Sequence, residues 1–288
     1  MTHRRTAVVT GTTTGIGLEL ASKLASVGWN LALINRSRER TQPLMDRVRL
    51  ESPEAVVSVY PADLSDQDQL RAAVADIAKE HNEVHALFNN AGVLRTTPGR
   101  SKHGHDLHFQ VNVIAVWQLM HMLRPLLAAT PQRAVVVNVS SSAIKSCGPL
   151  NVAGLSDPPK QGLFGAYGQS KLAVTVMTAM LAESFGADRI HLYAVDPGAT
   201  RTAMTAGSGV PFFIRWARSL LPGPEKGAVK MMHPLDDSWA DRNGSLIMSG
   251  KVARLPRAAD TQAIRTQLRE ILEGCIPDLV PNQGAGSP

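Results

Sequence analysis

Cysteine is scarce in this chain. Cys147 and Cys275 are the only two among 288 residues, and they form no Cys-x-x-Cys spacing. Two isolated thiols cannot build a disulfide framework or supply the paired cysteines of a zinc site. We therefore expect a protein of a reducing compartment that relies on a hydrophobic core. Its composition of 44% hydrophobic and 19% charged residues is sufficient for such a core.

Long apolar runs and strong charge are also missing. No uninterrupted run reaches the roughly 18 apolar residues of a membrane span. The first strand-like run begins at Thr6, which leaves no room for a signal sequence before it. The net charge of +6 is dispersed, and its densest cluster, NRSRER at 35–40, is short and contains no aromatic residue. We expect a cytoplasmic protein without a membrane span or a nucleic-acid partner.

Short β-branched runs alternate with longer amphipathic segments, which is the pattern of repeated βαβ units. Most of the predicted strands are apolar throughout, as expected where helices cover both faces of a sheet. The strands are predicted at 6–10, 30–35, 55–60, 84–89, 133–139, 189–195 and 245–250, and the helices at 15–27, 38–50, 66–81, 105–128 and 167–185. This predicts an α/β, doubly wound Rossmann fold: a single domain over 1–280, with a seven-stranded parallel sheet flanked by helices.

Three segments interrupt this alternation. Residues 142–166 are rich in Gly, Pro and Ser and are predicted to form a long loop. Residues 197–226 contain the apolar stretch VPFFIRWARSLL, which suits either a lid over a substrate or a helix at a membrane interface. The tail 281–288 is predicted to be disordered.

A glycine-rich turn, VVTGTTTGIG, joins the first strand to the first helix. Its glycines allow a tight turn, close approach of the backbone to a phosphate, and close packing of helix on strand. The N–H groups and the positive end of the helix dipole would then face an anion. Because the motif stands between a strand and a helix, it predicts dinucleotide binding rather than a structural turn, by Gly11, Thr13, Gly15, Ile16 and Gly17.

The end of the second strand, LINRSRER, bears on the choice between NAD and NADP. An acidic residue at this place would hold the ribose 2′-hydroxyl, whereas a basic one accommodates a 2′-phosphate. Asn35 stands where the acid would be, and Arg36 offers a planar group that can bind a phosphate. We predict NADP(H) as the cofactor, in contact with Asn35 and Arg36. The alternative is a basic helix start on the surface.

The segment GAYGQSKLAV places Tyr167 and Lys171 four residues apart, on one face of a predicted helix. Such a pair suits a proton donor and the ammonium group that tunes it, because a free tyrosine with a pKa near ~10 is a poor acid–base group at neutral pH. Such a pair also arises often by chance on an ordinary surface helix, so by itself it does not establish the function.

Further motifs end the successive strands: ADL (62–64), NNAG (89–92), VNVSS (137–141) and DPGATRT (196–202). In an open parallel sheet, ligands bind beyond these carboxyl ends. Together with TGxxxGIG and YxxxK, the motifs resemble the short-chain dehydrogenase/reductase family over roughly residues 6–205. The stretches NRSRER and 104–127, and the long gap between serine and tyrosine, are most similar to its retinol-dehydrogenase-like group.

The resemblance implies a role for each matching residue. Tyr167 would be the general acid in reduction and the base in oxidation. Lys171 would lower the pKa of Tyr167 and hold the nicotinamide ribose. Ser141 would hydrogen-bond the substrate oxygen, while its neighbours Ser140 and Ser142 would bond within the loop. Asn112 would bind a water that links the lysine to solvent, unless its role is structural.

The resemblance also implies the remaining cofactor contacts. Asp63 and Leu64 would flank the adenine. Asn90, Ala91 and Gly92 would line the ribose. Pro197, Gly198 and Thr202 would hold the carboxamide side. The chain departs from the family at Asp196, where Asn or His is more usual. It departs again in the glycine turn, which lacks the basic residue that some NADP-preferring members carry.

These features predict an NADP(H)-dependent carbonyl reductase or alcohol dehydrogenase. Phe212, Phe213 and Trp216 of the predicted lid favour a lipophilic or aromatic ketone, aldehyde or secondary alcohol as substrate. Two alternatives remain, a non-catalytic NADP(H)-sensing protein and a dehydratase or epimerase on the same scaffold.

The partners expected from the sequence are few. The histidine-rich stretches HNEVH (81–85) and HGHDLH (103–108) lack a known ligand spacing, so we predict no metal. The apolar stripes on the helices at 105–128 and 167–185 exceed what one sheet face requires. Members of the family that the chain resembles commonly pair these helices across a two-fold axis, so the resemblance implies a homodimer or homotetramer.

Overall fold

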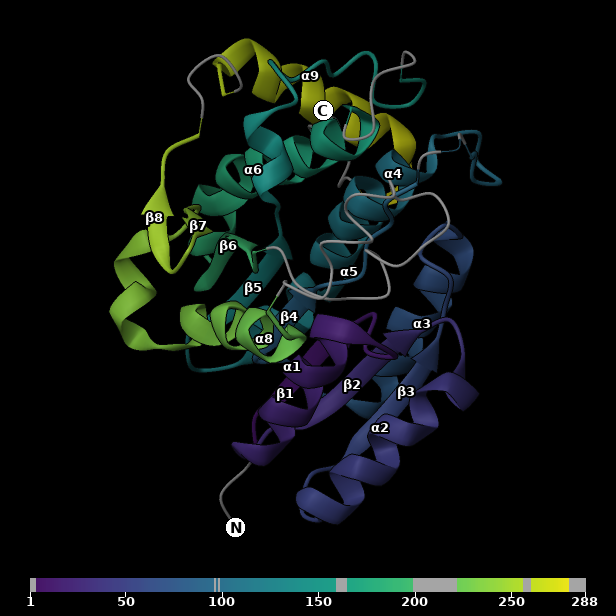
Figure 1. Ribbon diagram of the computed structural model, residues 1–288, viewed down its shortest axis with the longest axis vertical. Coiled ribbons are helices and arrows are strands. Elements are labelled where there is room, and N and C mark those ends of the chain that lie inside the picture. Colours follow the sequence, from purple (N-terminus) through teal and green to yellow (C-terminus); the bar gives the residue numbers. More distant parts are fainter. Residues whose placement is uncertain are drawn as a thin grey trace, which may run out of the picture.

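One twisted sheet runs through the computed structural model, with helices on both of its faces (Figure 1). The structure describes residues 4–95, 97, 99–158, 165–198, 222–255 and 260–279. The strand order is β3-β2-β1-β4-β5-β6-β7-β8. The strands are β1 (Thr6–Thr10), β2 (Asn30–Asn35), β3 (Val57–Pro61), β4 (Ala86–Asn89), β5 (Ala134–Val139), β6 (Ile190–Asp196), β7 (Leu246–Met248) and β8 (Lys251–Ala253).

The prediction of seven parallel strands is corrected by β8, which pairs antiparallel with β7 and makes the described sheet eight-stranded and mixed. Met248 pairs with Lys251, so Ser249 and Gly250 form a two-residue hairpin turn between them. Both have positive φ, 52° and 73°, as a type I′ turn requires. The sequence interpretation placed this Ser-Gly turn inside a strand and therefore missed the strand that follows.

All five predicted helices are present, with ends shifted by a few residues. They are α1 (Gly15–Ser26), α2 (Arg38–Glu51), α3 (Gln67–Glu80), the continuous run α4 (Leu107–Phe109), η1 (Gln110–Ile114, a π-helical turn) and α5 (Ala115–Ala129), and α6 (Gly165–Gly186). Short turns η2 (Ser142–Lys145), η5 (His233–Leu235), η6 (Asp237–Arg242) and η8 (Pro277–Leu279) complete the described helices, together with two that were not predicted, α8 (Pro224–Met232) and α9 (Gln262–Cys275).

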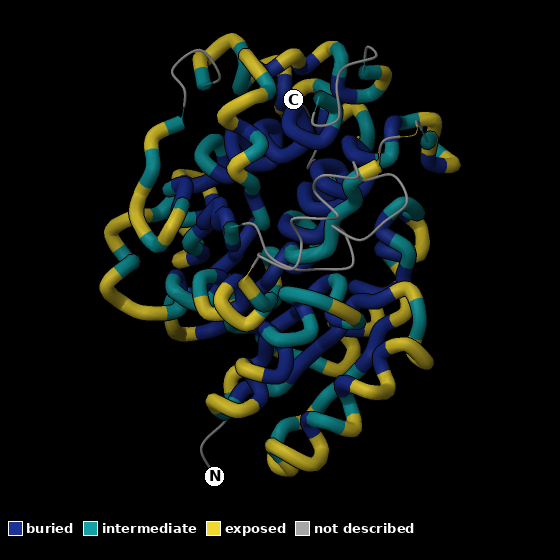
Figure 2. Tube along the Cα trace, in the orientation of Figure 1, coloured by how far each residue is buried: buried dark blue, intermediate teal, exposed yellow. Residues whose placement is uncertain are grey.

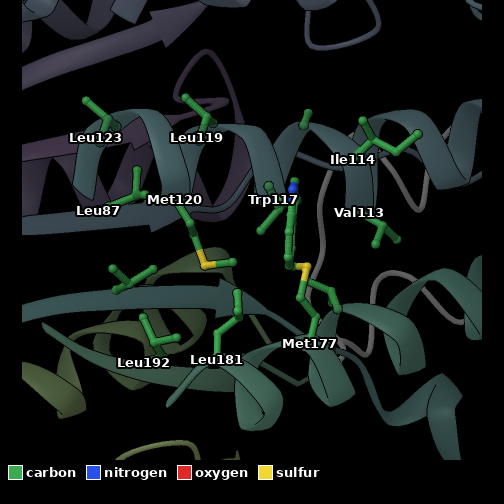
Figure 3. Close-up of a cluster of buried hydrophobic side chains, with 14 of the residues drawn as sticks. Leu87, Val113, Ile114, Trp117, Leu119, Met120, Leu123, Met177, Leu181 and Leu192 are labelled. Atoms are coloured by element: carbon green, nitrogen blue, oxygen red, sulfur yellow. The ribbon is translucent and has the colours of Figure 1, made fainter. Parts of the chain in front are cut away.

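Two apolar cores lie on opposite faces of the sheet. Leu20 of α1, Leu44 of α2 and Met231 of α8 belong to one, and the larger core lies beneath α3, α5, α6 and α9. Figure 2 shows the buried residues concentrated in the central strands and in the helices packed on them. In the larger core, Trp117 of α5 and Met177 of α6 point toward one another (Figure 3).

The C-terminal helix α9 bears on the predicted assembly. Leu268 and Leu272 are fully buried in the same core as the inner faces of α5 and α6. Part of the apolar surface on which the dimer prediction rested is therefore covered within the chain. Leu107–Ala129 is long and apolar enough to cross a membrane, but two thirds of its most apolar window (67%) is buried in the fold, as in a core helix.

Candidate active site

The glycine turn is as tight as predicted. Gly11 and Gly15 have φ of +70° and +63°, a region that L side chains rarely adopt. A Cβ at Gly17 would collide with the Gly11 carbonyl oxygen and with the Asn90 amide. That amide donates to the carbonyl oxygens of Thr10 and Gly11 at 2.9 and 3.0 Å. The segment that follows β4 thus fixes the β1–α1 turn through these two hydrogen bonds.

The first turn of α1 is suited to an anion. Ser37, Asp66 and Thr261 accept backbone N–H groups at the starts of α2, α3 and α9. At α1 the N-cap residue Thr14 makes no such side-chain bond with the residues described, and the first turn has no acidic residue. Uncapped N–H groups at the positive end of a helix dipole bind phosphate well. The turn therefore fits the diphosphate of a dinucleotide.

Asn35 has a structural role in addition to its predicted position near the cofactor. Its side chain is buried; Oδ1 accepts the Thr12 N–H at 2.8 Å, and Nδ2 donates to Thr12 Oγ1 at 2.7 Å and Thr41 Oγ1 at 3.0 Å. Both amide hydrogens are therefore used inside the fold. Arg36, in contrast, is exposed and has no hydrogen bond or ion pair to the described part of the chain. The exposed guanidinium of Arg36 is therefore available at this edge.

The other predicted cofactor residues follow the carboxyl ends of neighbouring strands, as expected. Asp63 and Leu64 follow β3, and Asn90, Ala91 and Gly92 follow β4. Pro197 and Gly198 follow β6, whereas Thr202 and the predicted lid residues Phe212, Phe213 and Trp216 lie outside the described residues.

Lys230 was missed by the sequence analysis. It lies on α8, and its Nζ donates to the Pro197 carbonyl oxygen at 3.2 Å. A Cβ at Gly227, on the same helix, would lie 3.0 Å from Ile16 and 3.4 Å from Pro197, so α8 packs directly beside the glycine turn. The helix was not predicted, because its first residues fell within the segment interpreted as a lid.

Tyr167 and Lys171 lie on the first turns of α6, and both side chains are buried. The Lys171 Nζ is 5.9 Å from the centre of the Tyr167 ring and donates to the Val139 carbonyl oxygen at 2.8 Å. Val139 is the last residue of β5, just before Ser140 and Ser141. Lys171 thus joins α6 to the end of β5, next to the predicted serine Ser141.

Asn112 lies in the π-helical turn η1 and faces the same place. Its Oδ1 accepts the Val93 N–H at 2.9 Å, and its Nδ2 donates to the Val93 carbonyl oxygen at 3.1 Å and to Ser170 Oγ at 3.0 Å. A Cβ at Gly92 would lie 3.0 Å from Asn112 Oδ1 and 3.4 Å from Lys171 Nζ. Asn112 therefore has structural contacts, and the choice between the link to a water and a purely structural role stays a prediction.

The three serines of the β5–α6 segment lie in different surroundings, and Ser140 bonds to α6 rather than within the loop as the resemblance had implied. Ser140 is buried, and its Oγ lies 2.8 Å from Thr175 Oγ1. Ser142 is exposed. Ser141 is half-buried and accepts the Ala143 N–H at 3.2 Å, and its side chain also hydrogen-bonds Tyr167. Of the three, Ser141 is the one whose hydroxyl lies beside the predicted proton donor.

The glycine turn, the described strand-end motifs and the start of the Tyr–Lys helix lie at the same edge of the sheet. The model of the short chain dehydrogenase family matches residues 5–209. This chain is a short-chain dehydrogenase. It is therefore an oxidoreductase of alcohol and carbonyl groups with a nucleotide-binding Rossmann-like fold, and its relatives make it retinol-dehydrogenase-like.

Human retinol dehydrogenase 11 is 30% identical over 270 residues, which cover 93% of this dehydrogenase and 84% of the relative. Human retinol dehydrogenase 12 is 31% identical over 207 residues, covering 72% and 65%. Human polyprenol dehydrogenase is 29% identical over 202 residues, covering 69% and 61%. The match thus spans just under two thirds of the last two proteins.

Solved structures share the fold at low sequence identity. A 3-ketoacyl-(acyl-carrier-protein) reductase from Brucella melitensis complexed with NADH has a TM-score of 0.68 at 20% identity, covering 85% of this chain and 97% of that one. A short chain dehydrogenase from Escherichia coli CFT073 complexed with NADPH has a TM-score of 0.68 at 23% identity, covering 86% and 97%. The same architecture therefore accompanies both cofactors.

The electrostatics of the dehydrogenase site differ from the sequence expectation. Burial raises the pKa of Tyr167; a side-chain hydrogen bond with Ser141 lowers it in part, and the charge of Asp196 raises it further. Burial also lowers the pKa of Lys171 to about 8. Desolvation of the buried phenol is the main cause of the raised Tyr167 pKa, and the lowering expected from Lys171 stays a prediction.

The long loop between β5 and α6 is anchored on the catalytic helix. Gln169, which lies between Tyr167 and Lys171, accepts the Asn151 N–H at 2.8 Å and donates to the carbonyl oxygens of Cys147 and Pro149 at 2.8 and 2.9 Å. Three loop side chains, Leu150, Val152 and Leu155, are buried in the larger core. Residues 147–155 are thus packed against the start of α6. In the sequence, the polar Gln169 between Tyr167 and Lys171 was the one sign of this contact.

One acidic cluster lies apart from this site. Potential metal ligands of Asp66, Asp68 and His103 lie within 4.8 Å of one another. The Lys102 Nζ is 2.6 Å from Asp66 Oδ1 and 2.9 Å from Asp68 Oδ2, and His103 Nε2 accepts the Gln67 N–H at 3.3 Å. The Lys102 ammonium therefore already pairs with both carboxylates in the described structure.

Proposed function

We propose that this short-chain dehydrogenase is an NADP(H)-dependent carbonyl reductase or alcohol dehydrogenase. Its substrate would be a lipophilic or aromatic ketone, aldehyde or secondary alcohol. The observation that carries the proposal is the assembly of Tyr167, Lys171 and Ser141 beside a glycine turn suited to a dinucleotide. A non-catalytic sensor of NADP(H) would have no need of a buried ammonium group next to a buried phenol.

In the reduction direction, a bound nicotinamide would supply the hydride to the carbonyl carbon. The Tyr167 hydroxyl donates its proton to the substrate oxygen, and the resulting phenolate regains a proton from solvent. The Ser141 hydroxyl donates a hydrogen bond to the same oxygen as negative charge develops there. Because the pKa of Tyr167 is raised, the phenol stays protonated at neutral pH, as a general acid requires. Oxidation, which requires the phenolate, is favoured at alkaline pH.

The preference for NADP(H) rests on the end of β2. Arg36 is exposed and unpaired within the described chain, and no carboxylate directly follows Asn35 to repel a 2′-phosphate. A guanidinium binds phosphate through two parallel hydrogen bonds. For the substrate, the names of the relatives support a lipophilic compound, since retinol and polyprenol are both long lipophilic alcohols.

The test is NADPH absorbance during incubation with a panel of lipophilic aldehydes, ketones and quinones, with Tyr167→Phe beside the wild type. The proposal expects turnover that Tyr167→Phe abolishes while NADPH binding persists. NADPH binding without turnover on any carbonyl, and without turnover of the matching alcohols with NADP⁺, would favour the sensor. Turnover that survives Tyr167→Phe would overturn the mechanism.

A further inference from the structure

His108 stands next to the predicted proton donor, and no role has been assigned to it. It is buried, as is Asp106 at the start of the same helix. Its Nδ1 lies 3.0 Å from Asp106 Oδ1, and its Nε2 lies 3.0 Å from the Arg95 backbone nitrogen. A backbone N–H can only donate, so Nε2 is the acceptor and Nδ1 carries the hydrogen. The network therefore assigns one neutral tautomer, with Nδ1–H donating to the carboxylate.

The His108 ring also packs on Tyr167. The two rings meet edge to face, with centroids 6.4 Å apart and planes at 70°. This contact lies on one side of the phenol, while the Lys171 Nζ lies 5.9 Å from the same ring centre. A ring whose two nitrogens are both bonded cannot rotate without breaking a buried hydrogen bond. The His108 ring therefore has a fixed position, and the Tyr167 ring packs against it.

His108 and Asn112, four residues apart, together hold the segment that follows β4. His108 binds the Arg95 N–H, and Asn112 binds both the N–H and the carbonyl oxygen of Val93. The preceding residue, Gly92, lies close to Lys171 Nζ. The segment at 92–95 thus borders the Tyr–Lys pair, and its position depends on these two side chains.

We propose that His108, anchored by Asp106, is a positioning residue for proton transfer by Tyr167. It fixes the phenol ring and the backbone at 93–95, and it acts through Tyr167 without touching the reacting atoms. This inference rests on the proposed function. A small misplacement of a reacting group is sufficient to lower a rate by up to about 100-fold. Loss of the anchored ring is therefore expected to lower kcat and to leave cofactor affinity unchanged.

The test compares His108→Phe with wild type, measuring kcat and KM for the best carbonyl of the panel and the Kd for NADPH by fluorescence. Phe keeps a ring beside Tyr167 but loses both hydrogen bonds. We expect kcat to fall by about 10- to 100-fold, with the Kd for NADPH within about twofold of wild type. His105→Phe is the matched control, because His105 packs on Phe109 and bonds Ser156 Oγ away from Tyr167. It should keep the wild-type kcat.

A second variant separates positioning from simple damage. His108→Phe leaves the Asp106 carboxylate buried without its partner, which is itself destabilising. Adding Asp106→Asn removes that charge. If kcat stays low in the double variant, the loss comes from the missing anchored ring, as proposed. If Asp106→Asn restores the wild-type kcat, or if His108→Phe never lost it, the proposal is wrong.

A replacement variant is needed in case His108→Phe does not fold. Should His108→Phe not fold, His108→Gln serves in its place, since its Oε1 can still accept the Arg95 N–H while the ring is absent. It should remain folded with kcat at least about 10-fold lower, and an unchanged kcat overturns the proposal.

Tyr167→Phe in the same series distinguishes failure of the proposed function from failure of the role of His108. If Tyr167→Phe keeps full activity, the proposed function fails; if it alone loses activity, only the role of His108 fails.

Discussion

The glycine turn and the surroundings of Tyr167, at the two ends of the candidate active site, depend on different kinds of groups. Around the glycine turn the decisive groups belong to the backbone: positive-φ glycines and the uncapped first turn of α1. Around Tyr167 they are buried side chains, Lys171, Asn112 and His108, each bonded to the backbone of a distant segment. The backbone site tolerates no added atoms, whereas the side-chain site is sensitive to lost hydrogen bonds and to charge. The four predictions below test this difference.

The largest effect is expected at the backbone site. In Gly17→Ala the new methyl group would collide with the Gly11 carbonyl oxygen and the Asn90 amide, so the turn has to open. We expect NADPH binding, measured by fluorescence titration, to weaken by at least ~100-fold, or about 2.7 kcal/mol. Gly274→Ala is the matched control, since a Cβ there meets no atom within 4 Å. Normal affinity in Gly17→Ala would show that the close approach has no role in binding.

At the side-chain site we expect a substitution that stabilises the folded protein. Lys171 is buried and its pKa falls from 10.5 to about 8, so the unfolded chain binds the proton more readily. Protonation therefore costs the folded state about 3 kcal/mol at pH values below about 8, and this cost disappears as pH rises toward 10.5. We expect Lys171→Met to raise the free energy of unfolding at pH 7 by about 1–3 kcal/mol, less the cost of the orphaned Val139 carbonyl.

Urea denaturation at pH 7 and at pH 10.5 measures this effect. The gain of Lys171→Met over wild type should shrink at the higher pH. Lys79→Met serves as control, because Lys79 is exposed and paired with Asp76. A variant that is less stable than wild type at pH 7 would contradict the prediction.

An intermediate effect is expected at the edge of the cofactor site. Arg36→Gln removes the exposed guanidinium proposed to bind the 2′-phosphate, and we expect the Kd for NADPH to rise about 10-fold, or ~1.4 kcal/mol, while that for NADH stays the same. Arg40→Gln, an exposed arginine of the same stretch, should change neither. Equal effects of Arg36→Gln on both cofactors would remove the basis for NADP preference.

The smallest effect concerns Asp196. Its charge raises the pKa of Tyr167, so Asp196→Asn should lower that pKa while keeping an oxygen to accept the Gly198 N–H. The alkaline rise of kcat for alcohol oxidation should then move to lower pH. A pH–rate profile of both proteins measures the shift. A movement to higher pH would show that Asp196 acts on Tyr167 by another route than its charge.

The sequence was most informative where function depends on spacing along the chain. The turn at 11–17 and the pair Tyr167–Lys171 are local patterns, and both are found as predicted. It was least informative where contacts join distant segments. Asn35 bonds Thr12 only because β1 and β2 pair in parallel, and no local pattern indicates that contact. His108 was considered from the sequence only as a possible metal ligand, although its spacing of four from Asn112 was visible.

The sequence by itself determined the alternation of strands and helices, the motifs at the strand ends and hence the family. These features depend on residues near one another in the chain and on periodicity. Only the tertiary structure decided the eighth strand, the cover of α5 and α6 by α9, the tautomer of His108 and the lowered pKa of Lys171. Burial and hydrogen-bond partners arise from the packing of distant segments, and desolvation has no signature in the order of the residues.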